Sequence, residues 1–425
     1  MQEYVNMDKA QLLQIKDEMS ATLEALKAKA MKLNMARGMP GREQLDLSEG
    51  LSEEVGSANG FKTESGVDCR NYGLPDGLPQ IKKLFAEILG VPESGVIVGG
   101  NSSLSMMFDT VSQFITHGVC GGEPWIKQGN VKFLCPVPGY DRHFGVTGYF
   151  GIEMITVPMD NDGPDMDTVE QLVAGDASIK GIWCVPMYSN PTGITYSDEV
   201  VRRMAALKPV APDFRVFWDN AYCCHHLTDN PDRLLNIYDE AVKVGNEDIV
   251  LQFASFSKIS FAGSGVAAVA ASPANIAAIK KRITLQTIGP DKINQLRHVR
   301  FFKDLDGVKA HMKKYEELLK PKFDAVQNAL QSELGGLGIG NWSTPNGGYF
   351  VSFDALPGCA KKIIALCADA GMAMTPAGAT FPHGIDPQDS NIRIAPTFPP
   401  VSELEVAMQI FCAAVKLCSA EKLLG

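Results

Sequence analysis

The sequence has no long hydrophobic run. No stretch approaches the roughly 18 consecutive apolar residues that a membrane-spanning helix requires. The first residues, Gln-Glu-Tyr-Val-Asn, are polar and do not resemble the apolar core of a signal peptide. We therefore expect a cytoplasmic protein without a membrane partner.

Positive charge is also scarce. The 425 residues include 39 Lys and Arg against 49 Asp and Glu, which gives a net charge of −10. Nucleic acids and anionic membranes select proteins with concentrated positive charge, so this balance argues against both as partners. A hydrophobic content of 45% and a charged content of 21% are those of a soluble globular protein.

Patterns typical of disulfides and metal sites are missing. None of the ten cysteines forms a Cys-x-x-Cys pair, and the neighbours Cys223 and Cys224 have poor geometry for a structural disulfide. The seven histidines show no metal-ligand spacing, and the adjacent His225 and His226 project in different directions. We expect reduced thiols and no metal.

The middle of the chain alternates short apolar runs with helical stretches. Seven strands are predicted, at Gly95–Gly99, Val131–Pro136, Glu153–Val157, Gly181–Val185, Arg215–Trp218, Ile249–Ala254 and Val266–Ala270. Because these runs are continuously apolar, we expect an α/β fold with a mostly parallel seven-stranded sheet, covered by helices on both faces. Helical patterns between the strands include Ser103–Phe114 and Val200–Ala206.

The two ends of the chain have different patterns. An amphipathic helix is predicted from about Met7 to Leu33, and another from Leu78 to Leu89. After about Lys309 we expect elements at 312–332 (helix), 347–353 (strand), 360–370 (helix), 391–395 (strand) and a last helix from Ser402, with Glu405 completing a capping box. The predicted organisation is an N-terminal helix and arm (1–45) packing with the small domain, a large domain (46–308) and a small α+β domain (309–425).

Three polar groups stand where predicted strands end. Lys258 closes the run Ser-Phe-Ser-Lys, Asp219 precedes Asn-Ala-Tyr222, and Asn190 lies in Ser-Asn-Pro-Thr-Gly. Open α/β sheets bind ligands at this edge. Taken singly, each has an ordinary alternative: a solvated lysine, a helix-capping aspartate, a turn asparagine.

A glycine-rich turn suits an anion. Gly99-Gly100-Asn101-Ser102-Ser103 follows a strand and opens a helix, so its backbone N–H groups and hydroxyls can surround a phosphate. Ser255 and Ser257 lie close to Lys258 in sequence and can complete the same cup.

In this order the motifs resemble those of fold-type I aminotransferases dependent on pyridoxal 5′-phosphate (PLP). The resemblance implies that Lys258 forms the internal Schiff base and shuttles the proton, and that Asp219 pairs with the pyridine nitrogen. Tyr222 and Asn190 are expected to contact O3′ of the cofactor. Tyr140, in Pro-Gly-Tyr-Asp-Arg-His, matches the aromatic residue that stacks on the ring.

One position departs from the family. Most relatives carry an arginine shortly after the lysine that clamps the phosphate, whereas here Gly265 occupies that place. No basic residue occurs from Ile259 to Ile279. Phosphate binding is expected to depend on hydroxyls, backbone N–H groups or a basic residue from elsewhere.

The resemblance also implies substrate and partner contacts. Arg393, in Asn-Ile-Arg-Ile-Ala, matches the arginine that binds the substrate α-carboxylate, aided by Asn190 and a backbone contact at Gly38. Tyr72 and the segment 288–295 match parts that reach the neighbouring subunit's site, so a homodimer with shared active sites is expected.

The residues of several motifs are similar to those of an atypical bacterial aspartate aminotransferase subgroup. These motifs are 138–144, 163–167 and 212–219, and the likeness includes the absent phosphate arginine. It implies ping-pong transamination of L-aspartate and 2-oxoglutarate to oxaloacetate and L-glutamate through a Lys258 aldimine. Candidate cations for the distal carboxylate are Arg37, Arg142, Lys292 and Arg297.

Other functions remain open at this point. A different amino donor, or elimination or decarboxylation by a PLP lyase, would use the same scaffold. A PLP-binding sensor domain of a transcription regulator is disfavoured because no basic recognition helix precedes the motifs. A catalytically inactive homologue is disfavoured by the complete set of motif residues.

Overall fold

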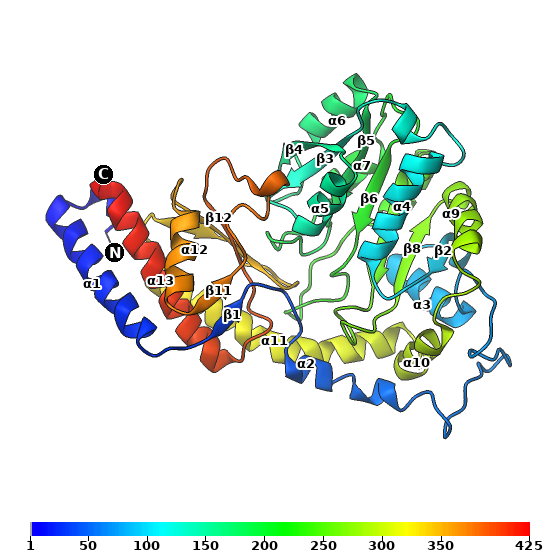
Figure 1. Ribbon diagram of the computed structural model, residues 1–425, viewed down its shortest axis with the longest axis horizontal. Coiled ribbons are helices and arrows are strands. Elements are labelled where there is room, and N and C mark those ends of the chain that lie inside the picture. Colours follow the sequence, from blue (N-terminus) through cyan, green and yellow to red (C-terminus); the bar gives the residue numbers. More distant parts are fainter. Residues whose placement is uncertain (1) are drawn as a thin grey trace.

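The computed structural model describes residues 2–425. Figure 1 shows a large sheet flanked by helices on one side of the molecule and a smaller group of helices and strands on the other, with one long helix, α11 (Leu305–Leu334), running beneath both. Chain segments far apart in sequence meet in the smaller part, where the first and last long helices lie side by side.

The large sheet has seven strands, and it confirms the predicted fold class. In sequence order they are β2 (Val96–Val98), β3 (Lys132–Val137), β4 (Glu153–Pro158), β5 (Ile179–Cys184), β6 (Arg215–Asp219), β7 (Val250–Ser255) and β8 (Ala267–Ala271). Their spatial order is β2-β8-β7-β6-β5-β3-β4, and only β8 runs antiparallel to its neighbours. The parallel strands β5, β6 and β7 therefore end at the same edge.

Helices cover both faces of this sheet. They are α3 (Pro79–Leu89), α4 (Ser103–His117), α5 (Asp141–Tyr149), α6 (Met166–Gly175), α7 (Asp198–Ala205), α8 (Ile237–Lys243), α9 (Pro273–Gln286) and α10 (Lys292–Phe302). Alternate residues of one strand enter different cores: Phe217 packs with α4 and Phe133, and Trp218 packs with Tyr196 on the α7 side. Burial on both faces explains why the strands are apolar throughout.

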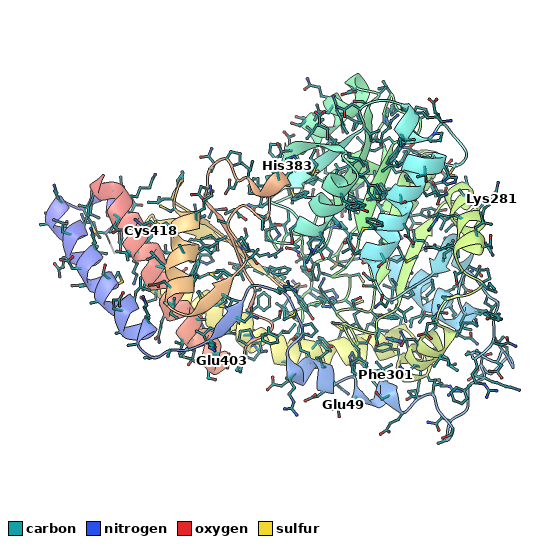
Figure 2. The ribbon with its side chains drawn as sticks, in the orientation of Figure 1. Glu49, Lys281, Phe301, His383, Glu403 and Cys418 are labelled. Atoms are coloured by element: carbon teal, nitrogen blue, oxygen red, sulfur yellow. The ribbon has the colours of Figure 1, made fainter. Side chains whose placement is uncertain are left out.

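The smaller part is built from both ends of the chain. Its elements are α1 (Lys9–Lys27), β1 (Leu33–Met35), α2 (Arg42–Asp46), β9 (Gly340–Trp342), β10 (Val351–Ala355), α12 (Ala360–Asp369), β11 (Met372–Met374), β12 (Asn391–Ile394) and α13 (Val401–Leu424). The sheet β12-β10-β9 is antiparallel, and β1 pairs with β11 in parallel. Helix α1 packs along α13, on which Figure 2 labels Cys418.

Short 3₁₀ turns complete the chain. They are η1 (Tyr4–Asn6), η2 (Glu49–Ser52), η3 (Glu93–Gly95), η4 (Trp125–Lys127), η5 (Glu247–Ile249) and η6 (Pro382–Gly384). The loop that carries η6 crosses to the large sheet, where Figure 2 labels His383 close to α5. Its Thr380 carbonyl accepts a hydrogen bond of 2.8 Å from the Gly139 N–H.

Two predicted helix boundaries are wrong, and the strand predicted at 347–353 is found at Val351–Ala355. The first helix ends at Lys27, because a turn precedes Leu33 and that residue starts strand β1 against β11. Helix α13 begins at Val401 after Pro400, so Ser402 lies inside the first turn and makes no capping bond. In both places the pattern is compatible with a helix, and neighbouring segments decide the boundary.

The described residues contain no helix that is both long and apolar enough to cross a membrane. Across residues 2–425, no group of three or more His, Cys, Asp or Glu side chains is placed to hold a metal ion.

Candidate active site

The site lies where three neighbouring parallel strands end. Asp219 is the last residue of β6, Lys258 follows β7, and Asn190 follows β5. Strand pairing sets Asp219 opposite Phe253, five residues before Lys258. The structure thus brings together the three residues that the sequence placed at strand ends.

Asp219 forms a buried pair with a histidine. His143 Nε2 donates a hydrogen bond of 3.0 Å to Asp219 Oδ2, and the two side chains have exposed fractions of only 2% and 3%. The other carboxylate oxygen, Oδ1, is buried and has no partner among the described residues. Burying a carboxylate oxygen without a hydrogen bond is unfavourable in free energy. Oδ1 is therefore available to accept a hydrogen bond from a bound group.

Two further side chains fix the histidine. The His143 ring stacks on Trp183 with centroids 4.5 Å apart, and Thr147 Oγ1 accepts from Trp183 Nε1 at 2.8 Å. Thr147 in turn donates to the His143 carbonyl. The sequence pattern gives no sign of this role for His143, because the contact joins residues 76 positions apart.

The Lys258 amine lies among aromatic rings. Its Nζ is 4.5 Å from the centre of the Tyr222 ring and 5.8 Å from that of Tyr349. Burial raises the pKa of Tyr222 far above its ordinary value, with nearby Arg393 opposing the shift. Tyr222 is therefore a neutral hydrogen-bond donor at any working pH.

The backbone of Lys258 is held from the other side. His225 Nε2 donates to the Lys258 carbonyl at 3.0 Å, and the Tyr349 hydroxyl donates to the same oxygen at 3.4 Å. Burial lowers the pKa of His225 to about 3, so the ring is neutral with its proton on Nε2. Neither contact was visible in the sequence, where His225 was considered only as a metal ligand.

The loop before α4 and the loop before Lys258, from which the sequence predicts a phosphate cup, are joined by hydrogen bonds. Ser102 is the N-cap of α4 but makes no side-chain cap bond, and Ser103 begins the helix. Ser255 Oγ donates to Ser257 Oγ at 3.1 Å, and Ser257 Oγ donates to the Asn101 carbonyl at 3.0 Å. The helix N-terminus is thus free to face an anion, whereas Ser257 must rotate its hydroxyl to donate to one.

Close packing leaves no room for a side chain at Gly265. A Cβ atom added at Gly265 would lie 2.9 Å from Ser257 N and 3.0 Å from Ser257 Cα and Oγ. Asn294 also holds this turn, donating to the carbonyls of Ser264 and Gly265 at 3.0 Å. The serine loop occupies the space that a side chain at this position would need.

Arg393 enters the site from the small sheet. Its Nη1 donates to Asn190 Oδ1 at 3.1 Å and to Asp141 Oδ1 at 3.0 Å, and its Nη2 donates to Thr375 Oγ1 at 3.2 Å. The guanidinium carbon lies 4.8 Å from the centre of the Phe350 ring. The structure therefore joins Arg393 to Asn190, as expected of a shared carboxylate site, and adds Asp141.

Gly38 lies next to Phe350, and Tyr140 lies next to His143. A Cβ atom at Gly38 would approach the Phe350 ring to 2.4 Å, so only glycine allows this close contact. The Tyr140 ring lies edge-on to His143, with centroids 4.9 Å apart. Burial raises the pKa of Tyr140 to about 12, although the positive charge of Lys258 opposes the shift.

Tyr72 is not brought to this cluster. Its side chain is 79% exposed. Among the distal-carboxylate candidates, Lys292 is buried and donates to the Gly73 carbonyl at 2.9 Å, while Arg37 and Arg142 are exposed. No contact in the described chain selects one of these cations.

The site residues fit the cofactor that the sequence predicted. A buried carboxylate oxygen without a partner suits a protonated ring nitrogen, a helix N-terminus suits a phosphate, and an amine on the adjacent loop suits an aldehyde. These groups are Asp219 Oδ1, the first turn of α4 and Lys258 Nζ.

Comparison with known proteins identifies the class. The fold is that of a fold-type I aminotransferase. A model of the family described as aspartate amino-transferase matches residues 7–425, and the chain belongs to this family. It is thus related to atypical bacterial aspartate aminotransferases.

Several relatives are similar over nearly their whole length. The chain is 44% identical to an aspartate aminotransferase of Corynebacterium glutamicum, covering 95% of this chain and 94% of the relative. It is 50% identical to a Mycolicibacterium smegmatis protein provisionally named an aminotransferase, covering 94% of each. A crystal structure of an aspartate transaminase from Corynebacterium glutamicum superposes with a TM-score of 0.96 at 43% identity, covering 99% of both chains.

Proposed function

We propose that this aminotransferase uses PLP to transfer the amino group of L-aspartate to 2-oxoglutarate, giving oxaloacetate and L-glutamate. The observation that carries the cofactor assignment is the buried Asp219 Oδ1, which has no hydrogen-bond partner within residues 2–425 and lies beside the strand that leads to Lys258. The donor assignment is supported by the Corynebacterium glutamicum relatives, which are named for aspartate.

The chain's own groups would divide the work as follows. Bound PLP supplies an electron sink for the bond that breaks at the substrate Cα. Lys258 would hold the cofactor and move the proton at Cα, and Asp219 would keep a proton on the ring nitrogen while His143 orients its carboxylate. Tyr222 would donate a hydrogen bond to the ring oxygen, because its raised pKa keeps the hydroxyl protonated.

The remaining contacts would hold the two ends of the reacting complex. Arg393 would bind the α-carboxylate beside Asn190. The N-terminus of α4, with Ser102 and Ser103, would bind the phosphate, and Ser255 would complete the cup with Ser257 after its hydroxyl turns.

We also propose a cytoplasmic homodimer with shared sites, and the domain division 1–45, 46–308 and 309–425. Support for the dimer comes from exposed apolar side chains on the expected contact segments: Tyr72 and Ile288 are 79% and 63% exposed. Tyr72 would then reach the phosphate of the other subunit.

A half-reaction tests the proposal. Purified cofactor-loaded protein is mixed with L-aspartate and no keto acid, and the visible absorbance of the lysine-bound cofactor is followed. We expect aspartate to remove this absorbance at a lower concentration than alanine or an aromatic amino acid. Lys258→Ala should show no such catalysed change.

Two results would contradict different parts of the proposal. If alanine or an aromatic donor removes the absorbance and aspartate does not, the donor assignment fails. If borohydride reduction attaches the cofactor to a residue other than Lys258, the site assignment fails.

A further inference from the structure

The guanidinium of Arg393 already carries a carboxylate partner from its own chain. Asp141 Oδ1 accepts from Arg393 Nη1 at 3.0 Å. The arginine side chain is only 7% exposed, whereas that of Asp141 is 32% exposed. The ion pair therefore has a buried cation and a carboxylate that borders solvent.

The contacts of Arg393 define where another carboxylate can enter. Its Nε is buried and unpaired among the described residues, and the Phe350 ring packs against the guanidinium. The Nε edge is thus enclosed, and a ligand arriving from solvent meets the terminal nitrogens. Nη1 on that side donates to both Asn190 and Asp141.

Asp141 is also well placed to leave. It is the first residue of α5, directly after Tyr140, and no described residue other than Arg393 forms an ion pair with it. A carboxylate at the first turn of a helix remains stabilised by the helix dipole after its side chain turns toward water. Arg393, by contrast, cannot lose its partner cheaply, because a buried unpaired guanidinium is strongly unfavourable.

We propose that Asp141 is a built-in competitor for the substrate α-carboxylate. It neutralises Arg393 while no substrate is present, and an entering carboxylate displaces it from Nη1. This inference rests on the proposed function only in assigning the α-carboxylate to Arg393, and it holds for any amino donor. Asp141 thereby sets the KM of the enzyme without taking part in bond breaking.

A difference in affinity follows from this exchange. Every carboxylate that binds must break a charge-assisted hydrogen bond, which is roughly twice as strong as a neutral one. In Asp141→Asn the amide oxygen still accepts a hydrogen bond from Arg393 Nη1 but carries no charge. The asparagine therefore still fills the space beside Arg393, but it competes only weakly with an incoming carboxylate. Maleate, a dicarboxylate without an amino group, can be used to measure carboxylate binding alone. We expect it to bind this variant about tenfold more tightly.

The test measures binding and turnover on the same cofactor-loaded protein. Calorimetry gives the Kd of maleate, and steady-state rates give KM and kcat for the accepted amino donor. We expect Asp141→Asn to lower the KM about tenfold with kcat unchanged, since Asp141 is displaced in both the ground state and the transition state. Asp141→Ser should change both constants in the same direction.

Asp198→Asn is the matched control. Asp198 is also the first residue of a helix, α7, and also accepts from one arginine, with Arg202 Nη2 at 3.1 Å. It lies on a surface helix with an exposed side chain, and its substitution removes the same charge and the same helix-terminal stabilisation. We expect no change in the Kd of maleate or in KM.

The outcomes separate this inference from the proposed function. A KM and Kd that are unchanged or raised in both Asp141 variants would show that Asp141 merely supports Arg393, and would overturn the inference. If the enzyme accepts another donor and maleate does not bind, the aspartate assignment fails. The KM of the accepted donor then decides the role of Asp141, because every amino acid brings an α-carboxylate.

Discussion

A methyl group at position 265 should damage the cofactor loop. In Gly265→Ala the new Cβ would lie 2.9 Å from Ser257 N and 3.0 Å from Ser257 Cα, both backbone atoms that move only with the loop leading into Lys258. Gly265 does not have a positive φ, so the substitution adds no backbone strain and its effect is steric. Every longer side chain at this position would make the same steric clash, because it contains the same Cβ atom.

The expected magnitude is the difference of two effects. Forcing an extra carbon into a filled space costs about 1–3 kcal/mol. Loss of chain freedom in the unfolded state returns about 0.4–1 kcal/mol when glycine becomes alanine. We therefore expect Gly265→Ala to lower the free energy of unfolding by up to about 2.6 kcal/mol, with about 1.3 kcal/mol from the midpoints of the two ranges.

Gly263→Ala is the matched control in the same turn. A Cβ there meets no atom within 4 Å, and its φ is also not positive. This variant should be unchanged or more stable by up to about 1 kcal/mol. Denaturant midpoints measured on cofactor-free protein compare the two substitutions without a contribution from PLP binding.

Gly265→Arg then tests the reasoning directly. It introduces the arginine that the family resemblance leads one to expect at this position, so charge alone would predict tighter PLP binding. We expect weaker binding, because Ser257 and Lys258 are displaced first. Tighter binding with a midpoint equal to that of Gly263→Ala would refute the steric explanation.

Three further outcomes are expected. His143→Leu removes the hydrogen bond to Asp219 and should lower the free energy of unfolding by about 1.5–3 kcal/mol. It should also lower kcat. Denaturation and rate measurements check the two effects, and an unchanged kcat would contradict the role of His143. Gly38→Ala pushes the buried Phe350 ring against Arg393 and should raise the KM of carboxylate substrates about fivefold, equivalent to about 1 kcal/mol, and this overpacking should also lower the unfolding midpoint. His225 has a folded pKa of about 3 against an ordinary 6.5, so the unfolded chain binds the extra proton and stability falls as pH drops below 6.5. This group contributes a slope of about 1.4 kcal/mol of unfolding free energy per pH unit. Melting temperatures measured between about pH 7 and pH 4.5 should therefore depend less on pH in His225→Gln than in the unchanged protein.

The sequence predicted the large sheet because its signal is local. Each strand buried on both faces is apolar along its own length, as in 249–254 and 215–218, and needs no partner to be identified. Residues that follow such strands, Lys258 and Asp219, were therefore predicted to lie at one edge, and the structure places them there.

Boundaries were predicted less well where a neighbouring segment decides them. Leu33 continues a helical pattern, yet it pairs with Met372 in a parallel strand that the amino-acid order does not indicate. Ser402 and Glu405 have capping-box spacing, but Pro400 takes the N-cap position and the box does not form.

The chain alone determined which chemical groups would gather: a lysine, a carboxylate and a phosphate-binding turn at the ends of parallel strands. Tertiary structure alone decided how those groups are held. The pairing of Asp219 with His143 and the contact of Arg393 with Asp141 join residues 76 and 252 positions apart. Such contacts depend on how side chains from different elements fill one space, and no periodicity within a single segment records that packing.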